Sequence, residues 1–176
     1  MSFSSLRRLV NRSTTASAEL APTPAGEEQF LKGLSFANGE GDAQDYAQAA
    51  QCYTEAATQG HSLAQLNLAA LFERGQGVTR DEAMALMWLT KAATLGNAAA
   101  QYRLGVHEHL ACRTGWTGPA GEGRIEALKW VRLSAAQGYR GAENACEFVA
   151  LGMTREEVAE GGRRAAAFRL SPEHGL

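Results

Sequence analysis

One short stretch of the chain contains side chains that could bind a metal ion. His107, Glu108 and His109 are consecutive, and Cys112 follows three positions later. Histidine nitrogens and a cysteine thiolate are ligands that zinc prefers. Residues two apart on a helix, however, are rotated by about 200°, so His107 and His109 would not face one ion. We therefore expect no metal and no other cofactor here, unless the helix ends before these residues.

Other motifs of enzyme chemistry are missing from the sequence. There is no nucleophile elbow, no phosphate-binding loop and no His-Glu-x-x-His motif. The glycine pairs at 39–41 and 75–77 follow no predicted strand, so they are interpreted as turn glycines and not as a dinucleotide fingerprint. We predict that the protein is not an enzyme.

Composition narrows the class of protein further. The chain has 176 residues, of which 45% are hydrophobic, enough for one domain with a core. Its 17 basic and 19 acidic residues nearly balance, which argues against a nucleic-acid partner. The chain has an odd number of irregularly spaced cysteines, Cys52, Cys112 and Cys146. Because a disulfide framework needs pairs, this favours a reducing, cytoplasmic location.

The first 24 residues differ from the rest. Residues 1–18 contain three arginines and no acidic residue, and the whole segment is rich in Ser, Thr and Ala. This composition is typical of a disordered leader. It is also typical of a segment that targets a protein to an organelle or a membrane surface, because Phe3, Leu6 and Val10 would share one face of a helix. Both interpretations are kept, although no apolar run approaches the roughly 18 residues of a membrane span.

The strongest signal is an internal repeat. Residues 52–60, 88–96 and 130–138 resemble one another, and the glycines that end them are 36 and then 42 positions apart. A second landmark, the Ala-Gln pair at 64–65 and 100–101, has the same 36-residue spacing. A fixed period in this range is typical of stacked helical hairpins.

Each unit divides into helix, turn and helix. In the second unit, Leu68 and Leu71 fit the apolar face of a first helix, which the glycines of segment 75–78 should end. Thr79 with Glu82 three positions later predicts a capping box that begins the second helix.

The third unit and the C-terminal segment depart from this scheme. Six extra residues within 112–121 predict an extended Gly-rich turn. The last segment begins at Thr154, which forms a second predicted capping box with Glu157. The Gly161-Gly162 pair should weaken that helix by roughly 1 kcal/mol per glycine relative to alanine.

These positions together resemble the Sel1-like repeat, a relative of the tetratricopeptide repeat. The second unit carries the resemblance through Ala64, Gln65, Leu68, Gly75, Gly77, Val78, Asp81, Ala85, Trp88, Ala92, Ala93 and Gly96. The resemblance implies an all-α, right-handed α-α superhelix of about three hairpins with a C-terminal capping helix. The predicted organisation is a leader at 1–24, a solenoid at 25–153 with units at 28–63, 64–99, 100–141 and a degenerate 142–153, and a capping helix and tail at 154–176.

The resemblance also implies a function. In similar proteins the first helix of each hairpin lines a concave face, so we expect a non-catalytic scaffold or adaptor that binds a peptide or helix of a partner protein there. The alternatives are an organelle-imported or membrane-associated assembly factor and, less favoured, a metal-dependent or hydrolytic enzyme. For Phe30, Leu66, Tyr102 and Trp116, which are among the binding residues predicted below, packing between or over the hairpins is the alternative role. The predicted partner-binding residues are Phe30, Leu66, Glu73, Tyr102, His109 and Trp116.

Overall fold

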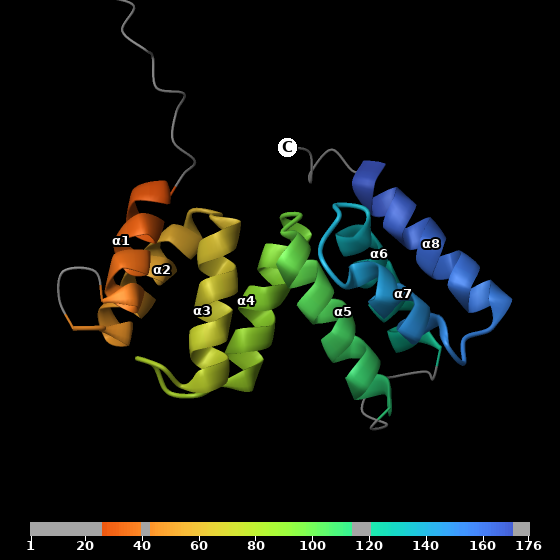
Figure 1. Cartoon of the computed structure of the whole chain (residues 1–176), viewed down its shortest axis with the longest axis horizontal. Helices are drawn as coiled ribbons and strands as arrows, with labels where there is room; N and C mark the ends of the chain where they lie inside the picture. The colour runs from red at the N-terminus through yellow and green to blue at the C-terminus, as the bar shows by residue number, and fades with distance from the viewer. Residues whose placement is uncertain (1–25, 40–42, 114–120, 171–176) are drawn as a thin grey trace, which may run out of the picture.

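The structure is a computed structural model that describes residues 26–39, 43–113 and 121–170. These residues form eight α-helices and no β-strand. The helices follow one another along the long axis of the molecule, from α1 at one end to α8 at the other (Figure 1). Their bounds are α1 Glu27–Asn38, α2 Tyr46–Thr58, α3 Ser62–Arg74, α4 Glu82–Thr94, α5 Ala98–Arg113, α6 Glu122–Ala135, α7 Ala142–Ala150 and α8 Arg155–Leu170.

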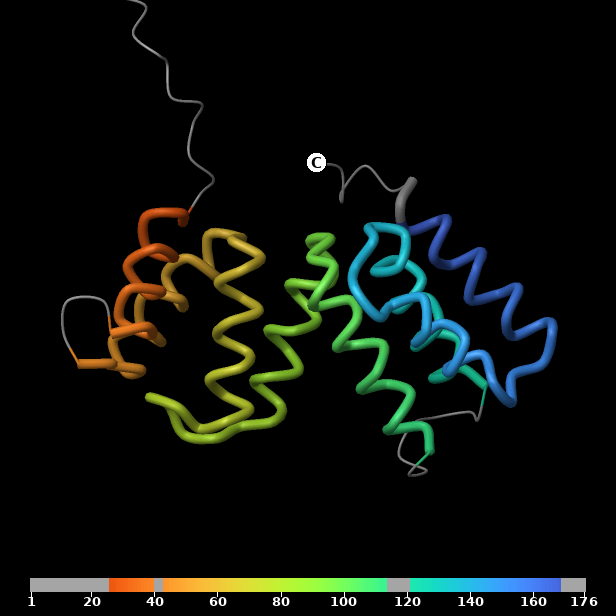
Figure 2. Tube along the Cα trace, in the orientation of Figure 1, coloured from red at the N-terminus to blue at the C-terminus, as the bar shows by residue number. Residues whose placement is uncertain are grey.

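Neighbouring helices pair into hairpins, and the hairpins stack. α1 packs on α2, α3 on α4 and α5 on α6, while α2 contacts α3 and α4 contacts α5 across the hairpin boundaries. In the tube of Figure 2 the hairpins follow one another in chain order along this axis. One apolar core runs from Phe30 in α1 to Ala165 in α8, and a smaller cluster lies between α6 and α7. The predicted all-α solenoid is confirmed.

The second helices of the first two hairpins begin at aspartates. The Asp45 carboxylate accepts hydrogen bonds from the backbone N–H groups of Ala47 and Gln48 at 2.9 and 3.0 Å. Asp81 does the same for Met84 at 2.9 Å. These bonds satisfy N–H groups that lack partners in the first turn of a helix. The prediction of a capping box at Thr79 is therefore wrong, because Asp81 is the N-cap of α4.

The first helices of the second and third hairpins begin with a side-chain cap as well. His61 Nδ1 accepts from the Ala64 N–H at 3.1 Å, and Asn97 Oδ1 accepts from the Ala100 N–H at 3.0 Å. His61 also contacts Glu27 at the start of α1 through Nε2, at 2.8 Å. The caps therefore repeat at the 36-residue period, and one of them links two hairpins.

The last two helices do not form a hairpin like the others. The capping box predicted at Thr154 is confirmed, since its N–H bonds the Glu157 carboxylate and its hydroxyl accepts from the Glu157 N–H. The resulting helix, α8, packs mainly on α6 and little on α7. Gly161 allows this approach, because a Cβ there would lie 3.0 Å from the Leu128 side chain.

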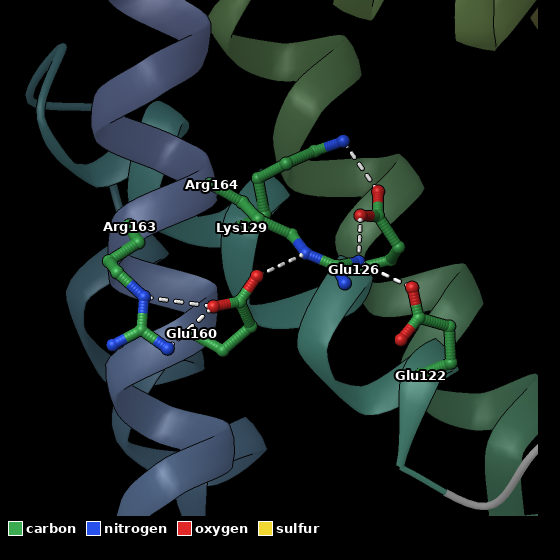
Figure 3. A network of polar contacts seen from close by, with 6 residues as sticks. All are labelled: Glu122, Glu126, Lys129, Glu160, Arg163 and Arg164. Atoms are coloured by element: carbon green, nitrogen blue, oxygen red, sulfur yellow. Dashed lines mark hydrogen bonds and ion pairs between the residues drawn. The ribbon is translucent and has the colours of Figure 1, made fainter.

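A group of charged side chains also fastens α8 to α6 (Figure 3). Arg164 on α8 contacts Glu122 at 2.6 Å and Glu126 at 2.8 Å, both on α6, and Glu160 on its own helix at 3.0 Å. Lys129 adds a second contact to Glu126. These carboxylates raise the pKa of Arg164, so the guanidinium is charged throughout the accessible pH range.

Within the described ranges, none of the helices has the length and apolar character needed to cross a bilayer. Of the predicted extended turn, Cys112 and Arg113 belong to α5, whereas residues 114–120, with Trp116, lie outside the described residues.

Candidate functional site

A groove of about 130 Å³ lies between the second and third hairpins. Its apolar floor comes from Ala69 of α3 and from Ala85, Leu86 and Leu89 of α4. Its polar wall consists of Glu73, Arg80, Glu82, Arg103 and His107.

The local structure explains why these side chains meet. Asp81 caps α4, which fixes the start of this helix beside the end of α3. Leu86 and Leu89 then lie three positions apart on one face of α4. On α5, Arg103 and His107 are four apart and face the same side. The groove is thus a product of two successive repeats and belongs to neither alone.

An ion pair spans the groove. Arg103 of α5 contacts Glu73 of α3, and the two side chains are 33% and 55% exposed. Pairs that are this accessible contribute about 0 to 1 kcal/mol to stability. Either partner could therefore exchange its contact for one with a bound molecule at small cost.

The remaining polar groups have no partner in the described part of the chain. Arg80 and Glu82 are exposed and form no ion pair there. His107 is half-buried, and its Nδ1 is buried without a hydrogen-bond partner. A buried polar atom without a partner is unfavourable by about 1–3 kcal/mol.

Of the five predicted partner-binding residues that the structure describes, only Glu73 lines this groove. Phe30 is 9% exposed and stacks on His61 with ring centroids 4.5 Å apart, so it packs in the core. Leu66 is half-buried against the same core. Tyr102 is half-buried and contacts Tyr139, at 5.3 Å between ring centroids.

His109 and Trp116 also lie away from the groove or outside the description. The His109 ring is 8% exposed and packs edge-on against Phe148, at 5.1 Å between centroids. Burial lowers the pKa of His109, and the positive charges of Arg113 and Arg124 lower it further, so the ring is neutral at pH 7. Trp116 is not among the described residues.

The two histidines that suggested metal chemistry face different neighbours. His107 lines the groove beside α3 and α4, whereas His109 packs against α7. Across the described ranges, no three His, Cys, Asp or Glu side chains are close enough to share an ion.

One set of repeated positions was not singled out from the sequence. One position of the repeat recurs on α1, α3, α5 and α7 at offsets of 36, 36 and 42, and it is occupied by Leu34, Ala70, Val106 and Phe148. The first three are half-buried and Phe148 is 52% exposed. The first three lie one helical turn after Phe30, Leu66 and Tyr102, so extending the repeat offsets by four positions would have found this row.

Comparison with known proteins decides the family. Residues 31–61, 62–97 and 98–139 each match the model of the Sel1 repeat. The chain belongs to the Sel1 repeat family. Sel1 repeat proteins are typically protein-interaction scaffolds, and their fold is generally non-catalytic.

Solved structures of Sel1 repeat proteins resemble the chain. A protective antigen of uropathogenic Escherichia coli with an SLR fold is 29% identical with a TM-score of 0.62, over 81% of this chain. The match spans 30% of that longer chain. A Sel1 repeat protein from Oxalobacter formigenes is 31% identical with a TM-score of 0.58, over 69% of this chain and 87% of its own. A search of curated proteins gives no match.

Proposed function

We propose that this Sel1 repeat protein is a non-catalytic scaffold or adaptor that holds a segment of a partner protein. The segment lies along the first-helix face, meaning the exposed side of α1, α3, α5 and α7. The groove between α3 and α5 takes one anchoring side chain of the partner. The observation that carries the proposal is this groove, with its apolar floor and its charged and polar wall.

The groove has the composition of an interface centre. A few side chains that fill apolar pockets provide most of the affinity in protein complexes, and polar groups surround them. Here Leu86 and Leu89 form such a floor, and charged side chains stand around it. Stacked repeats suit this role because they expose a continuous surface built from equivalent helices.

Exposed apolar side chains continue beyond the groove. Leu110 is 53% exposed and lies one turn after His107 on the same side of α5. Phe148 on α7 is 52% exposed. A partner that fills the groove could extend over both residues and bury them.

Site-specific crosslinking tests the proposal. Leu110 would be replaced by a photo-crosslinking phenylalanine derivative, and Glu55, an exposed residue of α2, would be replaced in the same way as the control. We expect a protein crosslinked at position 110 and not at 55, and we expect Glu73→Ala to reduce its yield. Equal capture at both positions, or capture indifferent to Glu73→Ala, would show that the groove is not the binding site.

We also propose a cytoplasmic location. Burial raises the pKa of Cys52 and of Cys146, which keeps both thiols protonated and unreactive. Cell fractionation of the full chain and of a variant lacking residues 1–24 tests this. Full-length protein in an organelle or membrane fraction, released by the deletion, would instead support a targeting leader.

A further inference from the structure

We propose that the groove between α3 and α5 binds a neutral aromatic side chain of the partner, with tyrosine preferred. The ring lies over Ala69 and Leu89, and its hydroxyl bonds Arg103. This inference rests on the proposed scaffold function and specifies the chemistry of the partner. The three hairpins of the chain differ at this site, which is filled in the first, open in the second and closed in the third.

In the first hairpin, a tyrosine of the chain itself fills the site. Tyr53 on α2 is 2% exposed, and its ring lies against Gly33 of α1, where an added Cβ would come within 2.7 Å of the ring. The Asn67 side chain hydrogen-bonds the Tyr53 hydroxyl. A buried phenol with its own hydrogen-bond partner is thus a stable occupant of this site in the repeat.

The second hairpin has the same site without the ring. The residues equivalent to Gly33, Tyr53 and Asn67, which lie 36 positions later and all line the groove, are Ala69, Leu89 and Arg103. Leu89 has no ring to reach across the site as Tyr53 does. The methyl group of Ala69, which Gly33 lacks, keeps α3 and α4 from closing over the shorter side chain. A space of about 130 Å³ remains.

The third hairpin removes this space in another way. Gly105 and Val131 occupy the positions of Ala69 and Leu89. A Cβ at Gly105 would lie 2.7 Å from a Val131 methyl and 2.9 Å from the Ala127 carbonyl oxygen, so the two helices are in direct contact. Among the three hairpins, the second combines a methyl group that separates the helices with a side chain too short to fill the gap.

The remaining space fits one aromatic ring. Its volume already excludes the Ala69 methyl and is close to that of a cavity of about 150 Å³ that accommodates benzene. Leu86 and Leu89 offer the ring apolar contact on the floor of the groove. A side chain as small as that of alanine or serine would leave most of the space empty.

The charges around the groove favour a neutral side chain. With histidine neutral, the lining has no net charge, because its two carboxylates and two guanidiniums belong to Glu73, Glu82, Arg80 and Arg103. A charged side chain would lose its water and would approach a like charge as well as an opposite one. A phenol is uncharged and still accepts a hydrogen bond. Arg103 stands where Asn67 serves Tyr53, and its ion pair with Glu73 is accessible enough to be shared.

The first experiment presents the full-length protein to an array of short peptides of randomised sequence. We expect the bound peptides to be enriched in tyrosine, and less strongly in phenylalanine, without a preference for acidic or basic sequences. The tightest tyrosine peptide is then compared, by fluorescence anisotropy, with the same peptide carrying a Tyr→Phe or a Tyr→Ala change. Loss of the hydroxyl should weaken binding about threefold to tenfold, and loss of the ring at least about thirtyfold.

Filling the groove from within should abolish this binding. The double variant Ala69→Gly with Leu89→Tyr recreates the residue pair of the first hairpin, so a ring of the protein occupies the groove. We expect its affinity for the tyrosine peptide to fall by at least about thirtyfold, while a cooperative thermal transition shows that it is folded. Leu95→Tyr is the matched control, since Leu95 is exposed and lies outside the groove lining, and it should retain the full affinity.

A second variant decides the question if the first does not unfold cooperatively. Glu73→Ala with Arg103→Ala removes the exposed ion pair as a whole, so no released carboxylate takes over the bond to the phenol. The tyrosine peptide and its Tyr→Phe form should bind this variant with nearly equal affinity, because the hydroxyl has lost its partner. Arg74→Ala, at an exposed arginine of α3 outside the groove lining, should keep the preference for tyrosine.

The outcomes separate this inference from the scaffold proposal. Peptides that bind and crosslink at position 110 without a preference for tyrosine would overturn the inference and leave the scaffold proposal standing. A crosslinked partner segment without tyrosine or phenylalanine would do the same. An array without any binder overturns the inference, and the scaffold proposal falls with it if no partner crosslinks at position 110. Binding that survives in the folded, filled variant would overturn both, because the groove would then not be the site.

Discussion

Gln137 donates a hydrogen bond from its side-chain nitrogen to the side-chain oxygen of Gln101, at 2.8 Å. Gln101 in turn donates to the carbonyl of Ala93 at 3.1 Å, so its buried amide is satisfied on both sides. Thirty-six positions earlier, Gln65 donates to the carbonyl of Ala57 at 3.0 Å, but its side-chain oxygen is buried without a partner. In the second unit, Leu95 occupies the position that Gln137 has in the third.

Leu95→Gln should therefore stabilise the protein. The new amide would supply the donor that Gln65 lacks, and Leu95 is 47% exposed, so little buried apolar surface is lost. We expect the free energy of unfolding to rise by about 1 kcal/mol, measured by urea denaturation. The reciprocal variant Gln137→Leu should lower it by a similar amount. A Leu95→Gln variant no more stable than Leu95→Asn, whose side chain is shorter, would contradict the explanation.

Arg164 should matter more than its neighbour Arg163. Arg164→Ala removes the contacts that join α8 to α6, and we expect a loss of about 1 to 2 kcal/mol together with faster hydrogen exchange in α8. Arg163 is 69% exposed and pairs only with Glu160 of its own helix, so Arg163→Ala is the matched control and should change stability little. Equal effects of the two variants would mean that the network does not hold α8.

Acid should release α8. Burial raises the pKa of Glu126, but hydrogen bonds from Lys129 and Arg164 outweigh burial and leave this pKa below its ordinary value. The resulting stabilisation is complete above the unfolded-state pKa of about 4.3 and is lost as the pH falls through the lower folded-state value. We expect the protection factors of the α8 amides, which correct for the pH dependence of intrinsic exchange, to fall below about pH 4.3. The Glu126→Gln variant should show weaker protection at pH 7 and a smaller change on acidification.

The 36-residue offsets were sufficient to predict the solenoid, because identical spacing at two landmarks requires equivalent hairpins. The position of the N-caps was less well predicted. Thr79 and Glu82 satisfy a local capping pattern, yet only Asp81 has an aspartate counterpart one repeat earlier, at Asp45. Where a local motif and the repeat disagree, the repeat identifies the cap, because equivalent turns have equivalent geometry.

The candidate site was only partly predictable. Helical periodicity shows which residues share a face, but it does not show how far the next helix covers that face. Phe30 is buried because His61 of the following hairpin stacks on it, and His109 is covered by Phe148. The groove joins nonequivalent positions of two repeats, such as Glu73 and Arg103, so aligning equivalent positions could not reveal it.

The contact between α5 and α6 provides the last prediction. A Cβ at Gly105 would lie 2.7 Å from a Val131 methyl and 2.9 Å from the Ala127 carbonyl oxygen. Backbone cannot move aside as a flexible side chain can, so Gly105→Ala must push the two helices apart. That strain should exceed the gain of about 1 kcal/mol in helix propensity, and we expect a net loss of about 1 to 2 kcal/mol.

Gly162→Ala is the matched control for this prediction, with the opposite expected sign. A Cβ at Gly162 would meet only the end of the Arg132 side chain, at 2.5 Å, and that guanidinium can rotate away. The substitution keeps the favourable propensity term, so the free energy of unfolding should rise by as much as about 1 kcal/mol. Because both glycines are in helix interiors, propensity alone predicts equal gains. If urea denaturation shows that Gly105→Ala and Gly162→Ala raise the free energy of unfolding by similar amounts, α5 and α6 are packed less closely than these distances indicate.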